Sequence, residues 1–319
     1  MDGRLPTPPH VQQLLGNAMI DLGNAWRDAG SRLAASDPPL ESEAAQVEED
    51  TVGSSFLGPV SMSLSAASDE FQAVARLVRM DETFGPSIAA LTRTTLETLG
   101  RAWWVLSATD LARSRHRAAL MYLNEVKSAQ RYTPTHIRAT LHDGRAEAVD
   151  AEPAVEEAQR DFDAVKVPGG EDKVPTYTAL VTGVMEAADV DEARAEYSHL
   201  SGVAHGEVFT VGGFSRQVSP DQPDVGSLQL PNSNLFQYIW TLTHVVDLCL
   251  LRWFELWQST AERERWEQRR DRAYGTFEHL RLRVYHWNPE TQDYGDWDPD
   301  RPPHAADCTT AFGRPIRRG

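Results

Sequence analysis

Apolar residues recur three and four positions apart along most of the chain, which is the spacing of amphipathic helices. The first such run covers residues 10–35, and its apolar residues are Val11, Leu14, Leu15, Met19, Ile20, Leu22 and Trp26. The same spacing predicts further helices near 60–81, 86–108, 111–132, 152–165 and 176–188, and another that begins after Asp189 or Asp191 and ends at Gly206. Gly85-Pro86 separates the second helix from the third, and Asp110 is the expected N-cap of the fourth.

The pattern changes after Gly206. The stretches EVFTVGGFS and DVGSLQLP are β-prone and contain glycines, which predicts loops or a small hairpin within 207–230. A long helix is then expected from about residue 233 to 272. Beyond Gly275, apolar and polar residues alternate around Asn288-Pro289, which predicts a hairpin near 280–297. The end of the chain, after Asp298, has the composition of a disordered segment.

These signals divide the chain into four parts. We expect an N-terminal helix over 1–36, an acidic linker over 37–54, a helical bundle over 55–274 and a hairpin-like, partly disordered tail over 275–319. The linker is predicted because SDPPLESEAAQVEED carries six acidic residues, no basic residue and two prolines. The predicted fold class is therefore all-α, a bundle of about seven helices with a small β-prone insertion.

A polar stripe runs along the helix within EARAEYSHLSGVAHGEV, residues 192–208. Successive helical residues turn by about 100°, so Tyr197, Ser201 and His205 share the direction of Arg194. His199 points elsewhere, at roughly 140° from Arg194.

This stripe has a purely structural alternative. Ala193, Leu200 and Ala204 lie beside the stripe and are expected to face the core, so the stripe lies at the edge of burial, where polar groups need partners. Its residues would then bond to one another and to a neighbouring helix. Asp189 or Asp191 would cap this helix, and Gly206 would end it.

The helix over 86–108 carries a second polar set. Arg93, Glu97 and Arg101 are spaced by four and could form a ladder of ion pairs, which contribute little when they are exposed. Trp104 lies on the same side as Arg93 and Glu97, which leaves open the alternative that this helix is central and buried all round.

The two polar sets together resemble a bacterial family of helical proteins without an assigned activity. Its members combine an Arg-x3-Glu helix with a later Tyr-x2-Leu-Ser-x3-His helix, here RTTLETLGRAWW and YSHLSGVAH. The resemblance spans roughly residues 70–255. It implies that Arg93 and Glu97 bind a ligand and meet Tyr197, Ser201 and His205 in one cleft.

The segment RAEYSH is similar, more distantly, to the HEPN domains, helical bundles that often act as metal-independent ribonucleases in phage defence and toxin systems. Their signature is an arginine followed by four to six residues and a histidine, which Arg194 and His199 match. On the stripe itself, His205 would take the proton from an RNA 2′-hydroxyl, and Arg194 would stabilise the phosphorane. Tyr197 or Ser201 would orient the imidazole. A homodimer would place two such helices face to face.

Composition limits the remaining classes of function. A formal net charge of −16 repels phosphate backbones and argues against generic nucleic-acid binding. No metal or cofactor is expected, because no phosphate-binding loop, GxGxxG, HExxH or paired-cysteine motif occurs. Two distant cysteines, no basic start followed by an apolar run, and no uninterrupted apolar span favour a cytoplasmic protein without membrane insertion.

Three functional hypotheses remain. The first is an intracellular bacterial bundle whose polar Arg/Glu and Tyr/Ser/His helices form a cleft for a ligand or partner. The second is a HEPN-like ribonuclease that acts on RNA. The third is a dimerising interaction module, in which Trp253, Phe254 and Trp257 serve as apolar anchors.

Overall fold

A computed structural model describes residues 7–48, 57–80, 84–133, 135–140, 146–219, 222–228 and 230–286. These residues form eleven helices and two short antiparallel hairpins, which confirms the all-α class. The number exceeds the predicted seven for three reasons: the N-terminal helix is counted with the bundle, the structure also contains the short helices α2 (Glu43–Glu48) and α9 (Val208–Gly212), and one predicted long helix is two.

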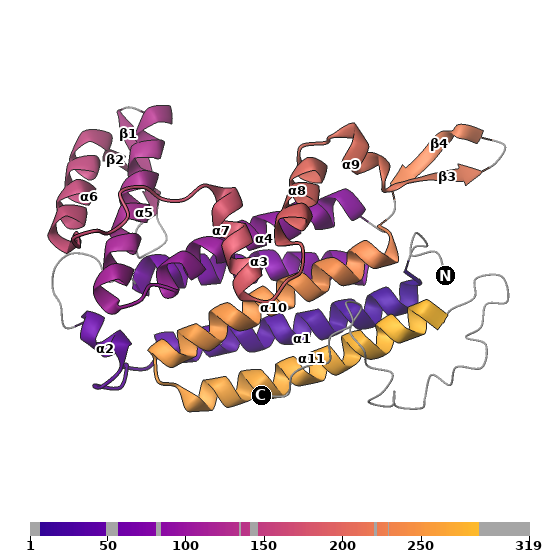
Figure 1. The fold of residues 1–319 in the computed structure, drawn as a ribbon, viewed down its shortest axis with the longest axis horizontal. Coiled ribbons are helices and arrows are strands. Elements are labelled where there is room, and N and C mark those ends of the chain that lie inside the picture. The colour runs from indigo at the N-terminus through magenta and orange to yellow at the C-terminus, as the bar shows by residue number, and fades with distance from the viewer. Residues whose placement is uncertain are drawn as a thin grey trace.

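Five long helices form the body of the protein (Figure 1). They are α1 (Pro9–Ala34), α3 (Leu57–Arg79), α4 (Gly85–Leu106), α10 (Asn232–Leu256) and α11 (Thr260–His286). Helix α1 packs on α3, α3 on α4, α4 on α10, α10 on α11, and α11 returns to α1, so the five close into a ring around one hydrophobic core. The predicted N-terminal helix is thus an integral part of the bundle.

Helix α4 lies at the centre of this arrangement. On the side away from the ring it is covered by α7 (Tyr177–Ala187) and α8 (Ala193–Ala204), while α3 and α10 flank it. Leu96 and Leu99 are completely buried, and Trp104 is 9% exposed. The indication that this helix is central is borne out, but it is not buried all round, because Ser87 and Thr94 on one side of it are exposed.

One end of the bundle carries α5 (Leu111–Tyr132), α6 (Ala151–Val165) and the hairpin of β1 (His136–Thr140) and β2 (Ala146–Asp150) (Figure 1). Asp110 caps α5 as expected, accepting a 2.8 Å hydrogen bond from the Arg113 amide. The β1–β2 hairpin was not foreseen.

The turn after α6 is held in place, although the sequence suggests a mobile loop there. The buried His116 ring donates from Nε2 to the Glu171 carbonyl at 2.7 Å and accepts from the Val167 amide at Nδ1. Arg117 also donates to the Glu171 carboxylate. These bonds fix the turn because each joins it directly to α5.

The predicted β-prone region is partly right. EVFTVGG forms the short helix α9 and its end, and a hairpin of β3 (Ser215–Ser219) and β4 (Gln222–Leu228) follows. The pairing runs from Ser215 opposite Leu228 to Ser219 opposite Gln222, with an irregularity between Gln217 and Ser219.

Two further expectations are wrong. The single helix over 233–272 is broken at Gln258, whose φ of 47° is left-handed, so α10 and α11 pack side by side. Helix α11 continues to His286, where a hairpin was predicted; the rest of that hairpin, 287–297, lies outside the described residues.

The acidic segment 37–54 includes the short helix α2. Arg252 of α10 anchors this helix through an ion pair with Glu43, in which the nitrogen and oxygen are 2.9 Å apart.

The apolar anchors of the dimerisation hypothesis are not on the surface. Trp253, Phe254 and Trp257 are 6%, 1% and 8% exposed within the single chain. They fill the core near the α10–α11 corner and are unavailable to a second copy.

Close packing of α1 on α3 generates a prediction. A Cβ on Gly16 would lie 2.5–2.7 Å from the backbone and Cβ of Arg79, whereas a Cβ on Gly30, in the same helix, meets nothing within 4 Å. We expect Gly16→Ala to lower the free energy of unfolding by about 1–3 kcal/mol through overpacking. The matched control Gly30→Ala should raise it by about 0.5–1 kcal/mol, as Ala replaces Gly in an open helical position. Chemical denaturation measures both, and equal effects would show that α1 and α3 are not in such close contact.

Candidate functional site

Arg93 and Glu97 of α4 meet Tyr197 and His205 of α8 in one cluster, called here the α4–α8 cluster. Arg93 Nε donates to Glu97 Oε1 at 2.7 Å, and the Tyr197 hydroxyl donates to the same oxygen at 2.7 Å. Arg93 Nη1 lies 3.1 Å from His205 Nε2. Four of the six predicted site residues are thus in one chain of contacts that joins two helices.

Helix α8 places His205 at the surface because it ends there. Gly206 has a φ of 70°, its amide bonds to the Val203 carbonyl, and the Glu207 amide bonds to the Gly202 carbonyl. This is the Schellman arrangement that glycine favours, so the prediction that Gly206 ends the helix is confirmed. His205 is the C-cap residue and is exposed.

The electrostatics of the cluster fix its charge states. Burial acts to lower the pKa of Arg93, but Glu97 and Tyr197 outweigh it and raise that pKa, so the guanidinium stays charged. Burial, reinforced by Glu97, raises the pKa of Tyr197, so its hydroxyl keeps its proton. Because a guanidinium only donates, His205 Nε2 must be the acceptor, and the neutral ring carries its proton on Nδ1.

A second carboxyl group, on α3, lies near the cluster and was not predicted. Burial raises the pKa of Glu70, the negative charge of Glu97 adds to this, and a hydrogen bond from Thr98 opposes it. One oxygen of Glu70 is buried without a hydrogen-bond partner among the described residues. A protonated Glu70 would spare the cluster a second buried negative charge. The helical pattern of 60–81 gave no signal for it, since Glu70 reads as one polar position among several.

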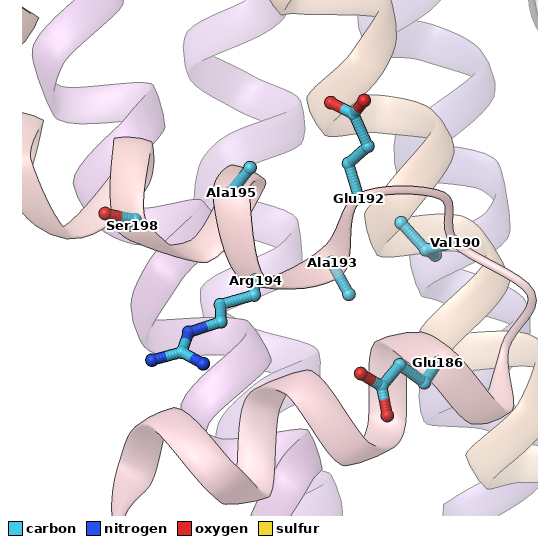
Figure 2. A pocket seen from close by; sticks show the side chains of 7 residues that line it. All are labelled: Glu186, Val190, Glu192, Ala193, Arg194, Ala195 and Ser198. Atoms are coloured by element: carbon cyan, nitrogen blue, oxygen red, sulfur yellow. The ribbon is translucent and has the colours of Figure 1, made fainter.

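Arg194 and Ser201 do not join the cluster. Arg194 is exposed and lines an open pocket of about 620 Å³ with Glu186, Val190, Glu192, Ala193, Ala195 and Ser198. Figure 2 shows Arg194 extending from the start of α8 beside α7, which carries Glu186. Ser201 is half-buried and makes no side-chain hydrogen bond to any described residue. Of the four residues in the predicted stripe, only Tyr197 and His205 contact α4 in the cluster. Arg194 is therefore not available to act beside His205.

The expected cap of α8 is also wrong. The helix begins after Glu192, which is in the left-handed region with a φ of 52° and makes no side-chain cap bond, so neither Asp189 nor Asp191 caps it. Ala193 and Leu200 face the core as predicted, whereas Ala204 is exposed.

The opposite side of α8 carries a polar network that spacing alone did not identify. Glu196 accepts from Gln237 and Thr241 of α10, each at 2.7 Å. His199 Nε2 lies 2.8 Å from the Tyr238 hydroxyl and 3.3 Å from Asn234 Nδ2. His199 points away from the α4–α8 cluster, as its helical angle predicts.

Arg101 leaves the expected ladder. It pairs with Glu125 of α5, so the ladder over 93–101 contains a single internal pair, Arg93–Glu97.

The described residues offer neither a metal site nor a membrane-spanning helix. No three His, Cys, Asp or Glu side chains gather closely enough there to hold a metal ion. In the same part of the chain, no helix has the length and apolar character needed to cross a membrane.

Comparison of the chain with models of known protein families, with curated proteins and with solved structures gave no match. The two resemblances noted above therefore stay hypotheses.

The bond between α4 and α8 can be measured directly. We expect a double-mutant cycle of Tyr197→Phe and Glu97→Gln to give a coupling free energy of about 1–2 kcal/mol, because a buried hydroxyl donates to a charged acceptor. Urea denaturation supplies the four unfolding free energies. Tyr122→Phe, at an exposed tyrosine on α5, is the matched control and should show no coupling to Glu97→Gln. A coupling near zero for Tyr197 would mean that the two helices do not share this bond.

A pH-dependent prediction follows from Glu196. Burial raises its pKa, although Thr241 and Gln237 oppose the shift, so its contribution to stability is greatest below the ordinary glutamate pKa of about 4.3 and is lost as pH rises through the folded-state value. Relative to the wild type, Glu196→Gln should therefore gain stability as pH rises from about 4 to about 8. Thermal unfolding across that range tests this, with the exposed Glu192→Gln as a control for simple loss of charge. A difference that moves the other way would contradict the buried position of Glu196.

Proposed function

We propose that this protein is a binding module that accepts an oxyanion group, a carboxylate or a phosphate, of a ligand or partner at Arg93 and His205. The observation that carries the proposal is the fixed guanidinium of Arg93. Its Nε donates to Glu97 and its Nη1 donates to His205. Its guanidinium carbon, Cζ, lies 5.8 Å from the centre of the Tyr197 ring. A cation held in this way loses little side-chain entropy on binding.

The hydrogen-bond inventory of the cluster decides the chemistry of the ligand. Glu97 Oε1 already accepts from both Arg93 and Tyr197. Arg93 has five N–H groups, and two of them are used in the contacts above. The protonated Nδ1 of exposed His205 is a further donor. The cluster therefore offers donors and would match an acceptor group, of which carboxylate and phosphate are the best partners of a guanidinium.

An apolar surface next to the cluster suggests what surrounds that acceptor group. Val208 and Phe209 of α9 are 88% and 95% exposed, and they follow His205 by three and four residues. Exposed adjacent apolar side chains at a polar site are typical of binding surfaces. The net charge of −16 favours a ligand with one oxyanion and an apolar part over a polyanion.

Ribonuclease action is less well supported by this geometry. The arginine that contacts His205 is Arg93. The hydrogen bond that Arg93 donates to Nε2 occupies the lone pair that a general base would use. His199, the histidine of the HEPN-like spacing, is half-buried and bonded to α10. A reducing, cytoplasmic setting remains part of the proposal, and the buried thiol of Cys249 agrees with it.

The proposal is tested with small probes by NMR of labelled side chains. Titration with acetate and, separately, with inorganic phosphate at constant ionic strength should shift the His205 ring and Arg93 Nε signals saturably. Whichever probe binds more tightly identifies the preferred oxyanion. The shifts should disappear in Arg93→Gln and weaken in His205→Ala, because each removes a donor.

Arg194→Gln is the matched control, since Arg194 is an exposed arginine of α8 that lies outside the cluster. It should bind the probes like the wild type. Equal loss in Arg194→Gln, or probe-induced shifts that persist in Arg93→Gln, would contradict the assignment of the site. His205→Ala removes an exposed side chain and leaves folding intact, so it remains informative if Arg93→Gln is unstable.

A further inference from the structure

Two side chains of α8, Glu196 and His199, bond to α10, and His199 is the one that can gain a positive charge. His199 Nε2 is within hydrogen-bond distance of two α10 groups, the Tyr238 hydroxyl at 2.8 Å and Asn234 Nδ2 at 3.3 Å. Its ring also stacks on Phe214 at 6.0 Å with an angle of 13° between the planes. His199 therefore joins α8, α10 and the segment after α9.

The partners of His199 require a neutral ring. The amide nitrogen of Asn234 only donates, and its oxygen accepts from Ser233, so the nitrogen faces the histidine. Nε2 must then be an acceptor, with the ring proton on Nδ1. Burial lowers the pKa of His199, which favours the same neutral form.

Protonation would disrupt this arrangement for a geometric reason. A proton on Nε2 would face the two N–H groups of the Asn234 amide, so that contact would become donor against donor. The Tyr238 hydroxyl could turn to accept, but the new charge would lie half-buried beside the Tyr238 and Phe214 rings.

Among the residues that the structure describes, no other ionisable group is placed to stabilise the charge as an ion pair. On α10 the ionisable neighbour is Tyr238, and burial keeps its hydroxyl protonated by raising its pKa. On α8 it is Glu196, whose two oxygens are engaged by Gln237 and Thr241. Arg93 and Glu97 of α4 bond to Tyr197 and His205 on the other side of α8.

We propose that His199 is a proton-operated latch, which attaches α8, and through Phe214 the end of α9, to α10 when neutral and loosens this attachment when protonated. Tyr197, His205, Val208 and Phe209 all lie on the latched segment, so the latch would control the oxyanion site. This consequence for binding rests on the proposed function, whereas the latch itself does not.

The lowered pKa of His199 decides how the attachment of α8 changes with pH. The stabilisation of the closed segment is complete above the pKa of a free imidazole, about 6.5, and is lost as pH falls from there through the lower folded-state value. Protection of the segment should fall about tenfold for each pK unit that separates the closed and open states.

The test is amide hydrogen exchange of α8 and α9, without ligand, between about pH 7.5 and about pH 5 and corrected for the intrinsic effect of pH. In the wild type, protection of α8 should drop selectively relative to α1 and α3 as pH falls. His199→Gln, which offers a neutral acceptor at every pH, should show a flat profile. In His205→Gln, which removes the other histidine at the end of this helix, the selective drop should persist. A wild-type profile without a selective drop, or a drop that persists in His199→Gln, overturns the latch.

A second measurement tests the latch on the wild type alone, in case His199→Gln does not fold. The ¹⁵N shifts of the His199 ring in the wild type should show an unprotonated Nε2 at neutral pH, and its titration should coincide with the loss of α8 protection. A protonated Nε2 at neutral pH overturns the proposal. Oxyanion binding is scored separately with acetate at pH 7.5, so that failure to bind acetate counts against the proposed function while the exchange profile decides the latch.

Discussion

The packing of five helices around α4 is the constraint on which the rest of this structure depends. Helices α3, α5, α7, α8 and α10 all contact it, and its apolar side chains join the ring of long helices to the outer layer. Most polar side chains on a helix packed in this way need hydrogen-bond partners, either within the helix or on a neighbouring element. Thr95 returns its hydroxyl to the Leu91 carbonyl, and Arg101 reaches Glu125 of α5. Arg93 and Glu97 find theirs on α8.

This constraint turns a common i, i+4 ion pair into a fixed group. On an open surface, Arg93 and Glu97 would contribute little, because both side chains would stay mobile and solvated. Here the pair is about one-fifth exposed and is tied to α8 by Tyr197 and His205. The other side of α8 is tied to α10 by Glu196 and His199. One short helix therefore connects the central helix, the outer surface and a pH-sensitive contact, which links the two proposals made above.

Local spacing predicted much of the fold because the signals were local. The Asp110 cap, the Gly85-Pro86 start and the Gly206 end each act within a few residues, and each was identified. The break at Gln258 was missed because charged residues beyond it continue the helical pattern. Ser259 and Glu262 have the spacing of a capping box, which could have marked that break.

The sequence predicted only part of the site, because helical spacing gives the direction of a side chain but not how far a partner on another helix can reach along the axis. Arg194 and His205 share a direction, but eleven residues separate them by about 16 Å along the axis. A single pair one turn apart on α4 cannot reach both ends of that stripe, so it meets Tyr197 and His205 and leaves Arg194 beside α7. Glu70, Glu196 and His199 depend on which helices become neighbours, which no spacing within one helix reveals.

The central claim is that α4 is the central helix, with five other helices packed on it, and native-state hydrogen exchange tests this most directly. Amides from Leu91 to Trp103 should exchange only through global unfolding, as slowly as any in the protein. Faster exchange there than in α1 or α3 would contradict the account.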